Sequence, residues 1–320
     1  MNKNLIYKKN LEIQTIENIK SSKSINTQRA YKSDYNHYIN FCEKNSLEYL
    51  KPNTKTISMY LTELSNNNYK FSTIRRKLVS ISLAYKLNGN YLNIKNPIID
   101  ENLKSIKRKL GNLQRGKKPI LLNELNKIIN SIDKNKSNIR KIRDKSIILL
   151  GFSGGFRRSE IVTLDIEDIE FLNEGIKIFL KKSKTDQYGD GFFKGIPYLE
   201  NKTMCPVINL SEWIKVSNIK KGPIFRKISK SDKILDNRLS DQTVALIIKK
   251  YTKIAGIENT NFSGHSLRSG FATVAASLGV DERSIMNMTG HKSSAMVRRY
   301  IRESNLFKNN ALNHFKFNSS

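Results

Sequence analysis

The segment TGHKSSAMVRRY, residues 289–300, places a histidine, two arginines and a tyrosine close together. Tyr300 follows His291 by nine residues and comes directly after the two arginines. A free phenol has a pKa near 10, so it is a weak nucleophile at neutral pH unless cations and hydrogen-bond donors favour charge on its oxygen. On a helix, Arg298 and Arg299 fall on other faces than Tyr300 and could meet phosphates or merely water. Tyr300 would also share a helix face with apolar neighbours, so an ordinary core position is the alternative.

A second pair of donors lies in GHSLRSGFATVAASLGV, residues 264–280. An apolar stripe at helical spacing runs through Leu267, Phe271, Val274 and Leu278. His265 and Arg268 lie together at about 120° from the centre of that stripe, so they are not simply core residues. They either face solvent or form a donor pair aimed at one anionic group.

The glycine-rich segment GFSGGFRRSE, residues 151–160, invites comparison with a phosphate-binding loop. It lacks the Gly-Lys-Ser/Thr ending that would hold a β- or γ-phosphate and Mg²⁺, so the sequence argues against ATP binding here. Arg157 and Glu160 stand one helical turn apart. They predict either a surface ion pair or a guanidinium that a carboxylate holds ready for a phosphate.

The charge of the whole chain favours an anionic partner. The 320 residues contain 57 Lys and Arg against 28 Asp and Glu, a formal net charge of +29. Such an excess repels itself unless a polyanion neutralises it, so nucleic acid is the first candidate and an anionic membrane surface the second. Lys, Asn and Ile are abundant throughout, so part of the lysine count is also explained by an AT-rich genome.

Metal and membrane sites find little support in the sequence. Cys42 and Cys205 are far apart and match no metal-ligand spacing, which points to a reducing compartment. The carboxylates form no evident cluster with histidine for a two-metal site. No apolar run approaches the roughly 18 residues of a membrane span, and the amino terminus lacks the apolar core of a signal peptide. We therefore expect a cytoplasmic protein with no metal, cofactor or membrane partner.

Periodicity in the first third predicts a small helical domain. We expect a polar extension at 1–22, a helical domain at 23–110 and a basic linker at 111–119, where GNLQRGKKP breaks the periodicity. Four apolar stripes mark the helices: Tyr31, Tyr35, Tyr38, Cys42; Ile57, Tyr60, Leu61, Leu64; Ile74, Leu78, Ile81, Tyr85; and Ile99, Leu103, Ile106, Leu110.

The remaining residues, 120–320, predict an α+β domain. Short β-like runs occur at 169–172, 176–180 and 192–199, separated by Asn, Gly and Asp. Helical patterns surround them, at 121–132, 139–152, 206–216, 240–255, 265–278, 281–289 and 293–301. The predicted fold class is mainly α with a small antiparallel sheet.

The order of these elements resembles the tyrosine recombinase, or phage integrase-like, family. An arginine, a lysine-bearing hairpin, His265-x-x-Arg268, His291 and Tyr300 follow one another at the family's spacings over roughly the last 200 residues. SGHSLRSGFAT, MTGH and RRYIR are similar to its two carboxyl-terminal motifs. Many members carry histidine after the second arginine, where this chain has Ser269, which affects a supporting contact rather than the catalytic set.

The resemblance implies a role for each residue. Tyr300 would attack a DNA phosphate, while Arg157 and Arg268 would offset the charge that grows on it. His291 would donate to the same phosphate, and His265 would accept the phenol proton or act as a further donor. Glu160 would orient Arg157.

A lysine of the hairpin would protonate the departing 5′ oxygen. In SKTDQYGDG, Lys184 matches the family pattern best, yet Lys181, Lys182 and Lys194 are close enough to leave the choice open.

The sequence thus predicts a helical core-binding domain and an α+β catalytic domain that form a basic clamp around DNA. The predicted enzyme is a site-specific recombinase or integrase that works through a 3′-phosphotyrosyl intermediate without metal or ATP. Two alternatives are a type IB topoisomerase-like enzyme and a catalytically silent DNA-binding protein of the same fold.

The expected partners are double-stranded DNA with paired recognition sites, further copies of the chain forming a tetramer on DNA, and accessory DNA-bending or directionality factors. The tail at 303–317 carries several apolar residues beyond the last predicted catalytic helix. We expect it to dock on a neighbouring protomer; folding back on its own domain is the alternative.

Overall fold

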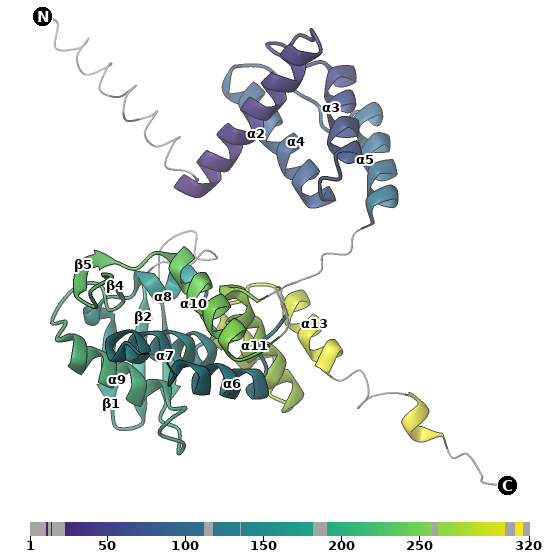
Figure 1. The fold of residues 1–320 in the computed structure, drawn as a ribbon. Coiled ribbons are helices and arrows are strands. Elements are labelled where there is room, and N and C mark those ends of the chain that lie inside the picture. Colours follow the sequence, from purple (N-terminus) through teal and green to yellow (C-terminus); the bar gives the residue numbers. More distant parts are fainter. Residues whose placement is uncertain are drawn as a thin grey trace, which may run out of the picture. The chain divides into compact units, whose positions relative to one another are not determined.

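The chain forms two compact units, residues 1–115 and 116–320 (Figure 1). This computed structural model describes residues 11, 14, 23–111, 118–134, 136–181, 191–257, 262–304 and 311–315. Each unit has a separate hydrophobic core, so each is described by itself.

The first unit is helical. Its described helices are α2 (Ile25–Lys44), α3 (Thr54–Asn66), α4 (Phe71–Leu87) and α5 (Pro97–Leu110), with α2 packed on α4 and α3 on α5. Side chains of Ser24, Asn53 and Asn96 accept backbone N–H groups and so define where three of these helices begin. Each of the four predicted stripes lies on one helix, and all of its residues except Tyr31 lie in the core of this unit or pack against it, so these helix predictions are confirmed.

The second unit is built around one buried helix, α7 (Asn138–Ser153). Its run IILLGF, residues 147–152, is buried along its whole length, as expected for a helix that is apolar all round. The helices packed against it include α6 (Leu122–Ile132), α9 (Pro206–Ser217), α10 (Asp241–Ile254) and α11 (Gly264–Ser277). A deep apolar core therefore supports the carboxyl end of α7, where the glycine-rich segment begins.

A short antiparallel sheet follows that segment. After α8 (Arg158–Thr163) and the 3-10 turn η1 (Ile166–Asp168), the strands β1 (Ile169–Leu172), β2 (Gly175–Leu180) and β3 (Phe192–Pro197) pair in that order. Ile178 of β2 lies opposite Lys194 of β3. The three predicted strands are thus confirmed.

A second hairpin, formed by β4 (Arg226–Ile228) and β5 (Ile234–Arg238), was not predicted from the sequence. Its strands are short and mostly polar, so they show no alternation of apolar and polar residues.

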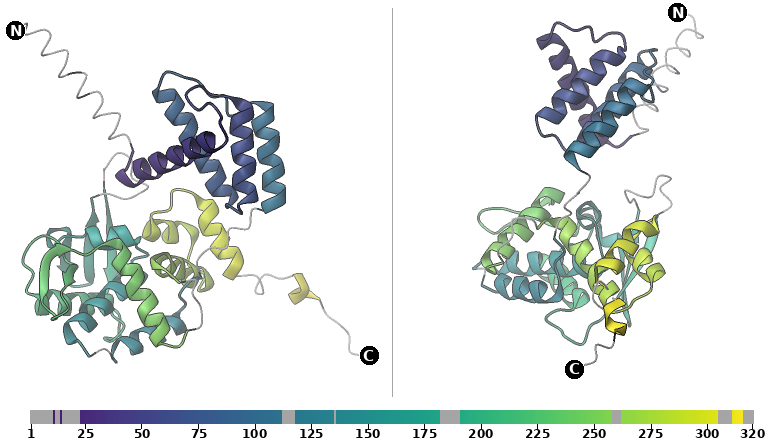
Figure 2. Two further views of the ribbon diagram at one scale, coloured as in Figure 1. Left: turned by 45° about the horizontal axis from the view of Figure 1, so that its top comes forward. Right: turned by 90° about the vertical axis from the view of Figure 1, so that its right-hand side faces the viewer.

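The last described helices pack through small side chains. Ala272, Ala275 and Ala276 of α11 meet Ile285 of α12 (Glu282–Thr289) and Val297 of α13 (Ser294–Ser304). Figure 2 shows these helices side by side, and the turn η2 (Ala311–His314) follows them.

One prediction for α11 was wrong. Leu278, expected to continue its apolar stripe, caps the helix and is 73% exposed.

The fold class, mainly helical with a small antiparallel sheet, is confirmed. None of the helices in the described ranges is long and apolar enough to cross a membrane. Of the tail, Leu312 and Phe315 are described and exposed, while 305–310 and 316–320 lie outside the described residues.

Candidate active site

Arg157 and Glu160 meet at the start of α8. The carboxylate of Glu160 accepts the backbone N–H of Arg157 at 2.8 Å and also pairs with its guanidinium. Glu160 is only 2% exposed, so the pair is not a surface ion pair, one of the two alternatives that the sequence left open. Burial by itself would raise the pKa of Glu160, but the backbone bond and the cations Arg157 and Lys194 lower it overall. An ionised carboxylate therefore fixes the direction of Arg157.

Arg268 reaches the same place from α11. It is 1% exposed, which rules out the solvated alternative, and its Nη1 donates to the carbonyl of Gly155 at 2.9 Å. Its Nη2 is buried and finds no hydrogen-bond acceptor among the described residues. Burial and the charge of Arg157 lower the pKa of Arg268 to about 10, while Glu160 and Tyr300 act in the opposite direction. The guanidinium stays charged and keeps one donor available.

His291 follows the end of α12. Gly290 takes a left-handed conformation, φ 62°, that ends the helix and turns the chain toward α13. The hydroxyl of the buried Thr289 lies 2.7 Å from Nδ1 of His291 and orients the ring. Burial first, and then Arg268 and Arg157, lower the pKa of His291 to about 4. The imidazole is therefore neutral at pH 7.

Tyr300 lies partly buried on α13, packed against the apolar cluster that α11, α12 and α13 form. Its ring centroid is 6.5 Å from that of His291. Its charge also influences Arg268. The structure thus brings Arg157, Glu160, Arg268, His291 and Tyr300 into one site, where Tyr300 also packs against an apolar cluster.

His265 is exposed in the first turn of α11, where the side chain of Ser263 accepts its backbone N–H. It contributes to the lowered pKa of His291, which places it near the same site.

The hairpin lysines have different positions. Lys184 and Lys182 lie outside the described residues. Lys181 is 2.6 Å from the carboxylate of Asp168, on the side of β2 and η1. Lys194 is 3% exposed and interacts electrostatically with Glu160, Arg157 and Arg268.

Sequence reasoning missed Thr289 and the two carbonyls of the Gly154–Gly155 turn. No residue type signals a backbone acceptor, and a threonine before Gly-His resembles any helix end.

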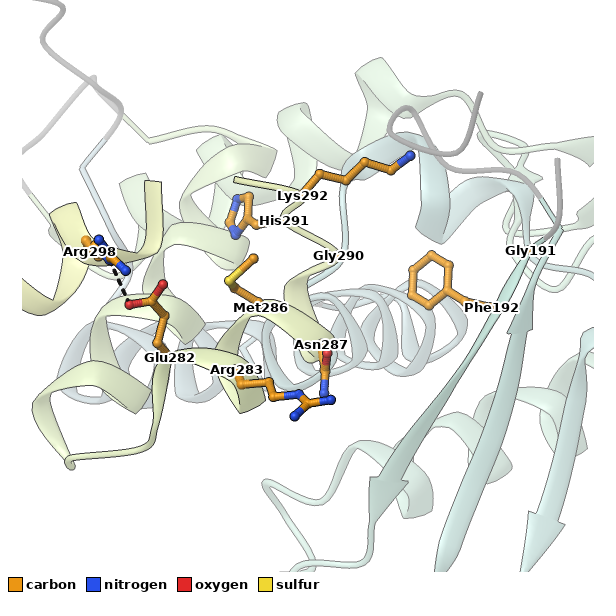
Figure 3. Close-up of a pocket in the computed structure, with 10 residues that line it drawn as sticks. All are labelled: Gly191, Phe192, Glu282, Arg283, Met286, Asn287, Gly290, His291, Lys292 and Arg298. Atoms are coloured by element: carbon orange, nitrogen blue, oxygen red, sulfur yellow. Dashed lines mark hydrogen bonds and ion pairs between the residues drawn. The ribbon is translucent and has the colours of Figure 1, made fainter. Parts of the chain in front are cut away.

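An open cavity of about 730 Å³ adjoins His291 (Figure 3). His291 and Lys292 line one side and Phe192 lies across from them. Arg283 and Arg298 add further positive charge, with Nε of Arg298 donating to Glu282 at 3.0 Å. A space of this size and charge beside His291 suits a polyanion that continues beyond one phosphate.

Groups of three or more His, Cys, Asp or Glu side chains placed to hold a metal do not occur in the described ranges. The site instead gathers two guanidiniums, an ammonium and a neutral imidazole around one carboxylate. Such an arrangement can stabilise a phosphoryl group as negative charge develops on it.

Comparison with known proteins decides the family. The model of the phage integrase family matches residues 119–306, and that of the phage integrase N-terminal SAM-like domain matches residues 16–86. The chain belongs to the phage integrase family. An integrase/recombinase xerD homologue of Selenomonas ruminantium is 39% identical over 306 residues, which cover 95% of this recombinase and 89% of the relative. A tyrosine recombinase XerC of Herpetosiphon aurantiacus is 25% identical over 285 residues, 88% of this recombinase and 85% of the relative.

Solved structures share the recombinase's fold. A XerH site-specific recombinase bound to palindromic difH substrate has a TM-score of 0.60 and 19% identity, and the match covers 80% of this chain and 70% of that one. A lambda integrase dimer bound to a COC′ core site has a TM-score of 0.60 and 17% identity, over 94% and 81% of the two chains.

The chain is therefore a site-specific tyrosine recombinase, an enzyme that cleaves and rejoins DNA. These matches do not favour the two alternatives, a type IB topoisomerase-like enzyme and a silent DNA-binding protein.

Proposed function

We propose that this recombinase cleaves DNA through a 3′-phosphotyrosyl link to Tyr300, with Arg157 and Arg268 holding the phosphate. The observation that carries the proposal is the buried Nη2 of Arg268, which finds no acceptor among the described residues although Tyr300 and Arg157 are close enough to affect the same guanidinium. Leaving a charged donor buried without an acceptor is costly, and a bound phosphate oxygen would satisfy it.

The cleavage step needs only side chains of this protein to form and break its bonds and to move its protons. The phenol oxygen of Tyr300 forms a bond to phosphorus, its proton passes to His265, and the bond from phosphorus to the 5′ oxygen breaks. Arg157 and Arg268 offset the charge of the five-coordinate transition state. The new ester keeps the energy of the phosphodiester bond, so a second strand's 5′ hydroxyl can reverse the step without ATP.

Two groups complete this scheme. Lys184 is proposed to give a proton to the departing 5′ oxygen, on the resemblance of SKTD to the family pattern. His291, neutral in the free protein, is proposed to donate to a non-bridging oxygen. A nearby phosphate would raise the pKa of this imidazole because it adds negative charge.

The wider assembly is also a proposal. The XerH and lambda integrase structures contain DNA sites, and the latter is described as a dimer. We propose that this recombinase binds paired sites on double-stranded DNA in the cytoplasm, as a tetramer joined by the tail at 303–317, with accessory DNA-bending or directionality factors. The helical domain at 23–110 and the catalytic domain at 120–320, joined by the linker at 111–119, would clamp the duplex, and the cavity beside His291 would receive its backbone.

The test uses a nicked DNA site that traps the covalent product. Tyr300→Phe should abolish the protein–DNA adduct and change DNA affinity less than about twofold, because only the attacking oxygen is lost. The wild-type adduct should form in EDTA with no nucleotide added. An adduct in the Tyr300→Phe protein would remove Tyr300 from the scheme, and a strict Mg²⁺ or ATP requirement would contradict the metal-free reaction.

A further inference from the structure

Lys194 is a buried side chain that interacts electrostatically with Glu160, Arg157 and Arg268 of the candidate site. It is 3% exposed, and its Nζ donates to the carbonyl of Gly154 at 2.7 Å. The same Nζ lies 4.2 Å from the centroid of the Phe156 ring and 5.7 Å from that of Phe192. Two aromatic faces and a carbonyl therefore replace its water shell.

Its acceptor belongs to the turn that carries the arginines. Gly154 accepts from Lys194, the next carbonyl, Gly155, accepts from Arg268, and Arg157 follows two residues later. Lys194 thus fixes β3 to the Gly154–Gly155 turn. The same turn accepts the hydrogen bond of Arg268 and directly precedes the segment that carries Arg157.

The charge of Lys194 also interacts with the charged side chains that surround the proposed phosphate site. Among the described residues, the charged groups that act on Lys194 are Glu160 and Arg157 from the start of α8 and Arg268 from α11. In return, Lys194 helps to keep the carboxylate of Glu160 ionised. That carboxylate is the group that orients Arg157.

We propose that Lys194 is a positioning residue of the recombination reaction: as a cation it holds the Gly154–Gly155 turn and the Glu160 carboxylate, and through them Arg157 and Arg268. The inference rests on the proposed phosphotyrosyl chemistry. Because Gly154, Phe156 and Phe192 surround its ammonium, Lys194 is assigned a positioning role, and proton donation to the 5′ oxygen is left with Lys184.

The positioning depends on protonation. Burial first, and then Arg268 and Arg157 against Glu160, lower the pKa of Lys194 to about 7. A neutral amine makes a weaker bond to Gly154 and no longer attracts Glu160. In the free protein the charged Lys194 therefore holds the Gly154–Gly155 turn and Glu160 fully below pH 7, and this hold weakens as the pH rises through 7.

The first experiment measures covalent adduct formation on a nicked site from pH 6 to 9, with protein limiting so that the rate reports the free enzyme. Lys194→Met should cleave about 10- to 100-fold more slowly, because small displacements of positioned groups cost that much. It should also lose the fall in rate above pH 7. Lys194→Arg, which stays charged, should show no such fall either.

Lys177→Met is the matched control. Lys177 lies on the neighbouring strand β2 with its side chain 45% exposed, and its Nζ is 3.4 Å from Glu170. This variant should keep the wild-type rate and pH profile. A Lys194→Met protein with the wild-type rate, or with an unchanged pH profile, would overturn the proposal.

A second substrate distinguishes positioning from proton donation. Replacing the 5′ bridging oxygen with sulfur gives a leaving group that departs as a thiolate and needs no proton. Lys194→Met should stay slow on this substrate, whereas a Lys184→Ala protein should recover. Full recovery of Lys194→Met would make Lys194 the proton donor and refute the positioning role. If the wild-type protein forms no adduct on either substrate, the proposed function fails instead.

Discussion

His291 shows how the environment of one residue sets its charge. The ring is held by Thr289, and burial first, and then the positive charges of Arg268 and Arg157, lower its pKa to about 4. An unfolded histidine takes up a proton near pH 6.5. Between pH 6.5 and 4 the unfolded chain thus holds a proton that the folded protein does not, and acidification favours unfolding.

The free energy of unfolding should therefore fall with decreasing pH by up to about 1.4 kcal/mol per pH unit from this one proton. The measurement is urea unfolding at pH 7 and pH 5, comparing the wild type with His291→Asn. The variant should lose less stability than the wild type between these pH values. Equal losses in the two proteins would mean that His291 titrates normally in the folded state.

At the scale of elements, the turn between α7 and α8 positions the arginines. Gly155 has a φ of +55°, and a Cβ at this residue would lie 3.1 Å from Thr289 and 3.2 Å from Phe271. Gly155→Ala should destabilise the protein by about 1–2 kcal/mol from backbone strain, and more from these contacts. Because the turn carries the acceptor of Arg268, it should also slow cleavage at least about tenfold.

Gly256→Ala is the control for that prediction. Gly256 has a φ of +65° and nothing within 4 Å of an added Cβ, so it carries the strain without the contacts. Thermal unfolding and adduct formation are measured for both variants. Equal effects of the two substitutions on cleavage would show that the turn does not position the site.

Helices and strands could be predicted from the sequence where their buried side chains recur at a regular spacing along the chain. The four stripes of the first unit and the three strands of the sheet have such patterns, whereas the polar β4–β5 hairpin has none. Burial of charge was not predictable. Arg268, Glu160 and Lys194 are enclosed by elements from distant parts of the sequence, and only the folded chain shows that they share one site. Ordered spacing nevertheless named most of the candidate residues, because Arg157, Arg268, His291 and Tyr300 follow one another along the chain in the order that resembles the family's.

At the scale of the whole molecule, the net charge of +29 is shared by two compact units. If both units contact DNA phosphates, each contact releases counterions and the logarithm of the binding constant falls with the logarithm of salt concentration. The slope is about −0.9 for each phosphate neutralised, so it counts contacts without knowledge of the target sequence.

Residues 116–320, which have their own hydrophobic core, should therefore bind DNA with a shallower slope than the full chain. Both proteins should carry Tyr300→Phe, so that no covalent adduct contributes to the measured affinity. Fluorescence anisotropy on one duplex from 50 to 300 mM salt would give the two slopes, and thermal unfolding would verify that the shorter protein is folded. A difference of about 0.9 corresponds to one phosphate contact made by residues 1–115. Identical slopes would mean that the first unit neutralises no phosphates, and the proposed clamp would be wrong.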